Sequence, residues 1–228
     1  MRGRILAVSI VMVLSHSSWV SAFEGVISFK SNYWGEQSEF EYSSKEGISR
    51  IDTRRARHGR AAVIMDVRAQ KVSMLLLNLR LAMVMNMSHT MLLTSNETGG
   101  KLIRTGKSLA VLGYRAERLM HMGEEEDTEI WAASGLGVFL GLHPTSSMFG
   151  RSGGSPPWVR AMRAEGLFPL IVIRKDKNGI ERGRIEVTAI ESKALPDKLF
   201  EIPSWYITYD KFNPENKMPG MPGTVWVK

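Results

Sequence analysis

The chain of 228 residues contains no cysteine at all. This absence excludes a disulfide framework, a thiolate metal site, a cysteine nucleophile and a lipid anchor attached through cysteine. Long apolar runs are also scarce, because beyond the N-terminal segment no stretch approaches the ~18 consecutive apolar residues that a membrane span needs. The fold must therefore be stabilised by its hydrophobic core alone, and a chain of this length can bury one.

The sequence also lacks the short motifs of common enzymes. It has no H-E-x-x-H pair and no P-loop. The glycine-rich stretch Gly150–Ser155 contains the letters G-x-S-x-G, but its surroundings predict a flexible loop and not the strand-to-helix turn that such a motif needs. The acids at 124–127 are consecutive, whereas a calcium loop alternates its ligands and ends on a glutamate. We therefore expect no cofactor, no bound metal and no catalytic residue. Carboxylate pairs that meet only in space leave an enzyme open as an alternative.

The first 22 residues have the composition of a secretory signal peptide. Arg2 and Arg4 precede the apolar run Ile5–Leu14, and small residues close the segment at Val20–Ala22. As a helix this run would span only ~15 Å, about half of a hydrocarbon core. We expect cleavage after Ala22 and a periplasmic or secreted protein that is not a lipoprotein. Removing two arginines and no acid lowers the formal charge from +7 to +5.

Most of the remaining chain alternates apolar and polar residues in short runs separated by turn residues. This pattern predicts one mostly β domain (α+β) over residues 23–210, built as an antiparallel meander. The tail at 211–228 is rich in proline and glycine, and we expect it to be irregular. The expected strands are Phe23–Tyr33, Glu39–Tyr42, Ile48–Ile51, Ala61–Val67, Lys71–Leu77, Leu81–Met91, Lys107–Leu112, Tyr114–Met122, Thr128–Ala133, Leu170–Lys175 and Glu181–Ile190.

Glycine and proline interrupt the strand pattern between Gly135 and Gly166. Within this region Pro157 can start a helix and Gly166 can end it. In such a helix Trp158, Val159 and Met162 share one face, which predicts a short amphipathic helix over an apolar surface. The helix would be either the cover of a cavity or a surface helix that closes one end of the core.

Methionine or histidine occupies every second position from Met83 to Met91. In a strand Met83, Met85, Met87, His89 and Met91 all point the same way. Thioether and imidazole ligands suit Cu(I), so copper handling is one hypothesis. Methionine is also the adaptable filler of apolar surfaces, so we favour the core or the wall of an apolar cavity.

The densest positive cluster lies between Arg50 and Arg60, with Arg54, Arg55 and Arg57 at its centre. Guanidinium groups bind phosphate well, so an anionic head group is the candidate ligand of these three arginines. No aromatic residue lies between Arg50 and Arg60, which argues against nucleic acid as a partner. A solvated charged face is the alternative interpretation.

Several landmarks in order resemble the bacterial exported family known as domain of unknown function 4412. The resemblance covers most of residues 23–207, and it implies no activity that could be transferred to a residue. Members often carry a cysteine soon after the Gly113-Tyr114 landmark, where this chain has Ala116. The landmarks are Phe23–Ile27, Ala61–Met87, Thr105–Lys107, Val111–Tyr114, Thr128–Trp131, Phe168–Leu170, Leu195–Pro203 and Trp205–Tyr206.

The family pattern is similar at the fold level to lipoprotein-carrier proteins of the bacterial envelope. This likeness implies a strongly curved antiparallel sheet or half-barrel, with an apolar cavity under one or two short covering helices. The first hypothesis is therefore an exported, non-enzymatic binding protein whose partner is a lipid or another apolar molecule. Its expected ligand-contacting residues are Met83, Met85, Met87, Trp158 and Met162.

Two other hypotheses remain open at this point. The sheet interior could be packed core in an envelope interaction or scaffold protein, whose partner would be an envelope protein. The methionine strand could instead handle copper. Neither hypothesis involves nucleic acid, and none of the three requires a transmembrane segment after signal removal.

Overall fold

A computed structural model describes residues 23–33, 35–55, 60–86, 101–137, 139–141 and 157–210. The expected signal peptide and C-terminal tail lie outside these residues. In chain order the elements are β1 (Gly25–Tyr33), β2 (Glu36–Lys45), β3 (Ile48–Arg55), β4 (Ala61–Asp66), β5 (Lys71–Leu76), β6 (Leu81–Asn86), β7 (Leu102–Val111), β8 (Tyr114–Met122), β9 (Glu126–Ala133), α2 (Pro157–Ala164), β10 (Phe168–Asp176), β11 (Glu181–Ser192), the 3-10 helix η1 (Asp197–Phe200) and β12 (Ile207–Asp210).

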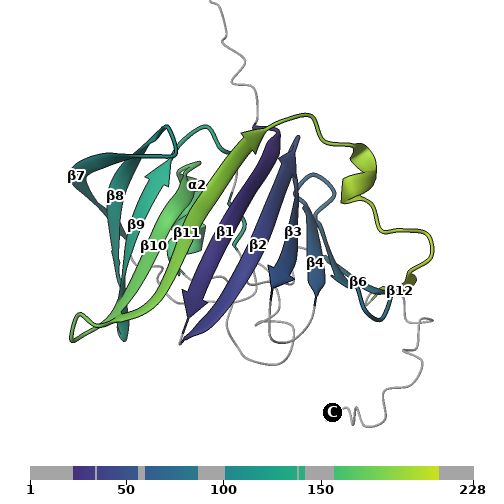
Figure 1. The fold of residues 1–228 in the computed structure, drawn as a ribbon, viewed down its shortest axis with the longest axis horizontal. Helices are drawn as coiled ribbons and strands as arrows, with labels where there is room; N and C mark the ends of the chain where they lie inside the picture. The colour runs from purple at the N-terminus through teal and green to yellow at the C-terminus, as the bar shows by residue number, and fades with distance from the viewer. Residues whose placement is uncertain are drawn as a thin grey trace, which may run out of the picture.

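The strands of the described chain form one curved, open sheet (Figure 1). Their order is β12-β6-β5-β4-β3-β2-β1-β11-β10-β9-β8-β7, so β1 and β11 join two antiparallel meanders in the middle. The predicted mostly β class with a curved sheet and a short helix is confirmed. The expectation of a purely antiparallel sheet is wrong at one edge, because β12 pairs with β6 in parallel.

Two tight turns explain how neighbouring strands are joined. The β2–β3 turn at Glu46-Gly47 and the β7–β8 turn at Leu112-Gly113 have positive φ at both central residues. This is the type I′ geometry that matches the twist of paired strands, with glycine at the second position. The expected strand Glu39–Tyr42 is too short, because β2 extends from Glu36 to Lys45. The Asn178-Gly179 hairpin between β10 and β11 is confirmed.

The sheet buries apolar side chains on both faces. The inner face carries the main hydrophobic cluster, which takes residues from both meanders and from α2. The outer face carries a smaller cluster of Ala62, Ile64, Leu75 and Ala82. The chain after β11 crosses this outer face through η1, and Phe200, Ile202 and Tyr206 pack against the smaller cluster. This crossing brings β12 to the edge beside β6.

The helix α2 follows its sequence signals closely. It begins at Pro157, and the amides of Gly166 and Leu167 donate to the carbonyls of Arg163 and Met162 at its end. It packs against β10 and lies behind the sheet in Figure 1. The predicted amphipathic helix is therefore confirmed. No helix in the described part of the chain is long and apolar enough to cross a membrane.

Candidate ligand-binding site

The inner face of the sheet presents an apolar surface that extends across both meanders. Period-two alternation places one side chain in two on this face, as Val63 and Met65 of β4 show. The surface continues from β8 across the central strands to β6, and α2 covers it at β10. Members that line it include Ile27, Phe29, Tyr42, Ile51, Val63, Val72, Met74, Leu119, Ile130 and Val172.

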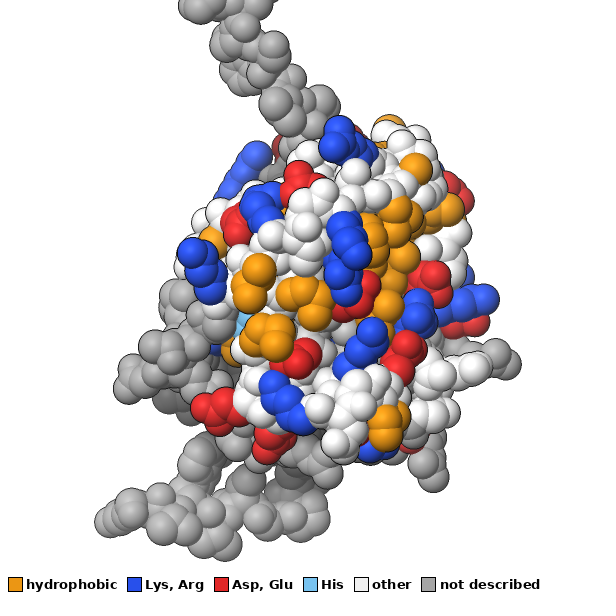
Figure 2. Space-filling view, turned by 90° about the vertical axis from the view of Figure 1, so that its left-hand side faces the viewer, with side chains coloured by type: hydrophobic (Ala, Val, Ile, Leu, Met, Phe, Trp, Pro, Cys, Tyr) orange, Lys and Arg blue, Asp and Glu red, His pale blue; other side chains and the backbone are white. Residues whose placement is uncertain are grey.

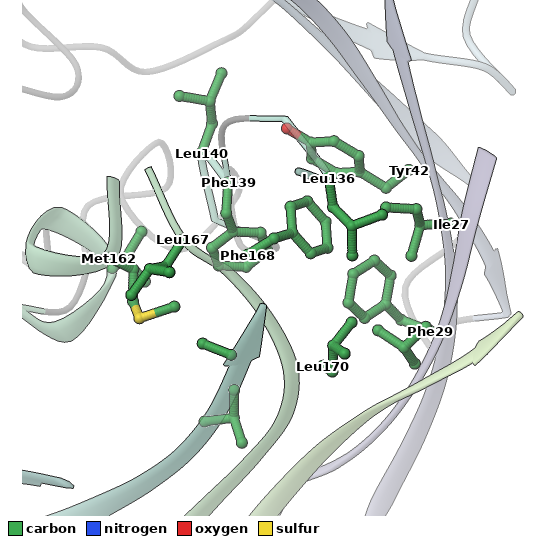
Figure 3. Close-up of a cluster of buried hydrophobic side chains, with 14 of the residues drawn as sticks. Ile27, Phe29, Tyr42, Leu136, Phe139, Leu140, Met162, Leu167, Phe168 and Leu170 are labelled. Carbon is green, nitrogen blue, oxygen red and sulfur yellow. The ribbon is translucent and has the colours of Figure 1, made fainter. Parts of the chain in front are cut away.

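Aromatic rings fill the centre of this face (Figure 3). The Phe139 ring lies 6.5 Å from the Phe29 ring and 5.4 Å from the Phe168 ring, and it stacks on Trp158 at 6.0 Å. Such edge and stacked contacts strengthen packing beyond simple area burial. Tyr42 joins the group, and its hydroxyl donates to Ser49 Oγ at 2.8 Å. Burial raises the pKa of Tyr42 to about 12, so this hydroxyl stays neutral.

The methionine strand lies at one side of the inner face. Met83 is half-buried and packs against the main cluster, and Met85, two residues on, is only 7% exposed. Met83 pairs directly with Met74, which is fully buried on β5. The predicted alternation is confirmed for these residues, since Ala82 belongs to the cluster of the outer face. Met87, His89 and Met91 lie outside the described residues.

The two ligand-contacting residues expected on α2 both point into the main cluster. Trp158 is 6% exposed, and Met162 is fully buried beside Leu167 (Figure 3). The fold thus brings Met83, Trp158 and Met162 into one cluster, although they come from opposite halves of the sequence. Their role in holding a ligand is a proposal that the fold permits.

Cationic groups lie beside this apolar surface on the described part of α2. Arg160 and Arg163 are one helical turn apart, and burial together with the charge of Arg160 lowers the pKa of Arg163. Burial also lowers the pKa of His121, with Arg160 acting in the same direction and Asp127 against it. His121 is 5% exposed, and its Nε2 atom has no hydrogen-bond partner among the described residues. Its neighbour Met122 is 52% exposed, as expected for opposite faces of a strand.

The proposed head-group arginines lie elsewhere. Tyr42 faces the main cluster, so alternation places Glu41 on the outer face. Arg54, at a bulge of β3, forms an ion pair with Glu41 and therefore lies on that face too. Arg55 ends β3, but its side chain is outside the described set, as is the whole of Arg57. The structure therefore separates Arg54 from the methionine wall by the thickness of the sheet.

Metal coordination finds little support among the described residues, which contain no group of three or more His, Asp or Glu side chains that could hold an ion. The copper hypothesis therefore depends on Met83 and Met85 together with Met87, His89 and Met91, which lie outside the description.

A polar hollow of about 340 Å³ lies where β1, β2 and β11 meet. Strand register explains its composition, since Lys30 lies between Glu39 and Glu186, and Asn32 lies between Gln37 and Arg184. Sequence reasoning missed this group because β11, which supplies Arg184 and Glu186, lies far along the chain from the β1–β2 hairpin. Its charged and amide lining suits water or a small polar solute, and it does not suit an acyl chain.

The family comparison places these features in context. The model of the family described as domain of unknown function (DUF4412) matches residues 23–206. This chain belongs to that family. The match includes every strand except β12, together with α2 and η1, so the family landmarks correspond to the sheet itself. The Leu195–Pro203 landmark is the crossing of the outer face. No curated protein matches the sequence.

Solved structures share the fold at low sequence identity. An uncharacterized conserved protein from Thermus thermophilus has a TM-score of 0.52 at 8% identity, over 82% of this chain and 91% of that chain. PNGF-II has a TM-score of 0.49 at 16% identity. The match covers 82% of this chain but only 30% of the PNGF-II chain. A chain of the MucA/MucB complex of Pseudomonas aeruginosa has a TM-score of 0.42 at 14% identity. That match covers 79% of the present chain and 56% of the other. The first likeness shows a shared fold.

Proposed function

We propose that this DUF4412 protein is an exported, non-enzymatic binding protein that holds an acyl chain or another apolar molecule on the inner face of its sheet. The ligand would lie between Trp158 and Met162 on α2 and Met83 and Met85 on β6. The observation that carries the proposal is the continuous apolar surface of the inner face, which extends from β10, where α2 packs, across the sheet to β6.

The energetics of burial favour such a ligand. A twelve-carbon chain buried at ~0.8 kcal/mol per methylene gains about 10 kcal/mol before ordering costs. Useful affinity would therefore need no specific polar contact. Because the lining residues are themselves buried, entry of a ligand requires part of the chain that covers them to move. Met87 lies outside the described residues, so its place in this wall stays a prediction from the sequence alternation alone.

A head group could be bound in two places. The sequence suggests Arg54, Arg55 and Arg57, but Arg54 is on the outer face and is paired with Glu41. Arg160 and Arg163 lie on α2 beside the apolar surface, so an anionic head group of a ligand held there would reach them first.

A packed-core interaction protein is the second candidate. The ring cluster around Phe139 supports it, because closely packed aromatic side chains at the centre of the inner face are typical of a filled core. Copper handling by the methionine strand is the third candidate. It requires Cu(I) binding that is lost when Met83 and Met85 are both replaced by leucine.

The first experiment is native mass spectrometry of the protein purified from its own exported fraction, followed by denaturing extraction. A bound lipid would support the carrier and identify its chemical class. Calorimetric titration of the delipidated protein with a fatty acid then measures affinity. Protein that carries nothing and binds no fatty acid would overturn the proposal and favour the packed core.

A matched pair of variants tests the assigned wall. Met83→Glu should weaken fatty-acid binding at least about tenfold, because a charge beside the acyl chain must be desolvated. Met122→Glu is the control, since Met122 is the same residue type and is 52% exposed. Circular dichroism establishes that both variants fold. Equal affinity of the two folded variants would exclude Met83 from the wall.

A further inference from the structure

The three most exposed large hydrophobic side chains of the described chain gather at one corner of the sheet. Leu79 is 69% exposed, Trp205 67% and Ile207 63%, while no other large hydrophobic side chain in the described residues exceeds 52%. Leu79 lies in the β5–β6 turn, and the Ile207 amide donates to the carbonyl of Arg80 at 2.9 Å. We call Leu79, Trp205 and Ile207 the apolar corner. It lies at the β12 edge, on the right of Figure 1.

The corner is held in place by buried neighbours. Tyr206 packs against the outer-face cluster, its amide donates to the Pro203 carbonyl, and its ring lies 6.5 Å from the Trp205 ring. Ile207 is fixed by its parallel pairing with Leu81. The three apolar side chains therefore project from a rigid support. Trp205 Nε1 donates to no described residue, which leaves it free for a polar partner.

Two arginines of the described chain lie at this corner, and the nearest acids along the chain from Trp205 and Ile207 are Glu201 and Asp210. Arg80 belongs to the same turn as Leu79, and Arg60 precedes Ala61, which pairs with Leu76 just before that turn. Both arginines are exposed, and neither makes an ion pair with a described residue. The chain carries no acid from 78 to 81 or from 202 to 209. Without the expected signal peptide its formal charge is +5, because residues 1–22 carry two arginines and no acid.

We propose that the apolar corner docks the protein onto an anionic lipid surface, with Trp205, Leu79 and Ile207 entering the interfacial region and Arg60 and Arg80 contacting phosphate groups. Tryptophan with a free indole N–H is suited to the boundary between head groups and acyl chains. Positive charge complements anionic lipid. A protein partner fits less well, because three side chains cover much less than the ~800 Å² per partner of a stable interface.

Other exposed hydrophobic side chains do not share these properties. Ile103, Leu109 and Leu112 belong to the β7 edge, where hydrophobic and charged side chains of both signs are interspersed (Figure 2). Arg104 on this edge is paired with Glu117 and Glu165, so its charge is compensated. This edge therefore supplies matched control positions.

The test is co-sedimentation of the purified exported protein with vesicles of phosphatidylcholine alone and of phosphatidylcholine mixed with phosphatidylglycerol. We expect binding to the mixed vesicles that falls as salt is raised. Leu79→Ser combined with Trp205→Ser should lower this binding at least about tenfold. Arg60→Gln and Arg80→Gln should each lower it about fivefold, and only for mixed vesicles.

The control is Ile103→Ser combined with Leu112→Ser, which removes as many exposed hydrophobic side chains from the β7 edge and should leave vesicle binding unchanged. Failure of the native protein to bind mixed vesicles, or equal binding by both double variants, would overturn the proposal. If the corner instead binds a protein partner, the native protein should not bind the mixed vesicles. The proposal does not require a bound ligand, and fatty-acid titration of the Leu79/Trp205 variant shows separately whether the inner face binds an acyl chain.

Discussion

Glu129 is the one acidic residue that is buried in the described fold. Ile130 faces the core, so alternation places Glu129 on the outer face, where the Arg118 guanidinium donates to its carboxylate at 2.9 Å. The Trp131 indole donates to the other carboxylate oxygen at 3.0 Å, and Lys175 lies 3.6 Å away. The Arg118 hydrogen bond is the main cause that holds the pKa of Glu129 at about 2, and burial opposes it.

This shift predicts how stability depends on pH. The folded-state pKa of Glu129 is about 2 against an ordinary value of 4.5, so the folded state binds this proton less tightly than the unfolded state does. The ionised Glu129 carboxylate therefore contributes at most about 3 kcal/mol to the free energy of unfolding. This contribution is complete above pH 4.5 and is lost as the pH falls toward 2. Glu129→Gln should therefore cost about 1–3 kcal/mol of unfolding free energy at pH 7 and much less near pH 2.

Urea denaturation of the native protein and Glu129→Gln at several pH values measures this difference. Glu117→Gln is the control, because Glu117 pairs with Arg104 on the exposed surface, where an ion pair contributes little. A difference between the native protein and Glu129→Gln that stays constant from pH 7 to pH 2 would contradict the assigned charge interaction.

The strand β1 has a closely packed backbone at Gly25. It lies between β2 and β11 in the middle of the sheet and joins the two meanders. A Cβ atom added at Gly25 would lie 2.1 Å from the carbonyl oxygen of Glu191 on β11. Neither backbone can yield without breaking the register that pairs Gly25 with Ser192 and Ser44.

Gly25→Ala should therefore destabilise the protein by about 3 kcal/mol or more. Gly35→Ala provides the comparison, because Gly35 also has a positive φ, of 78°, but a Cβ atom there would meet nothing within 4 Å. That variant should cost only about 1 kcal/mol, the backbone strain alone. Thermal unfolding of both variants tests the prediction, and equal losses would show that the contact with Glu191 is relieved.

For the whole molecule, the described fold begins where the expected signal peptide ends. Phe23 is 8% exposed and belongs to the main cluster, and β1 starts two residues later. Cleavage after Ala22 would therefore remove no residue of this core. The intact mass of the protein purified from the exported fraction should correspond to a chain that starts at Phe23. Retention of Met1, or a start beyond Phe23, would contradict this prediction.

The local structure of this protein could be predicted from its sequence alone. Some features depend only on residues that are close in sequence, so they can be recognised in the sequence itself. Examples are the alternation at Ile27 and Phe29, the Asn178-Gly179 turn and the apolar stripe of α2. The same logic predicted that Met83 and Met85 share a face and that Trp158 and Met162 pack inward. The ordered landmarks supported the family resemblance, and the likeness of that family to lipoprotein-carrier proteins implied the curved sheet.

Which distant segments meet depends on the tertiary structure. The parallel pairing of β12 with β6 joins short segments that carry no local signal for one another, and it creates the corner where Trp205 lies beside the Leu79 turn. The ion pairs of Glu129 likewise depend on the register of three strands. Alternation assigns a residue to a face, but which side chains become neighbours on that face depends on how the whole sheet pairs and curves.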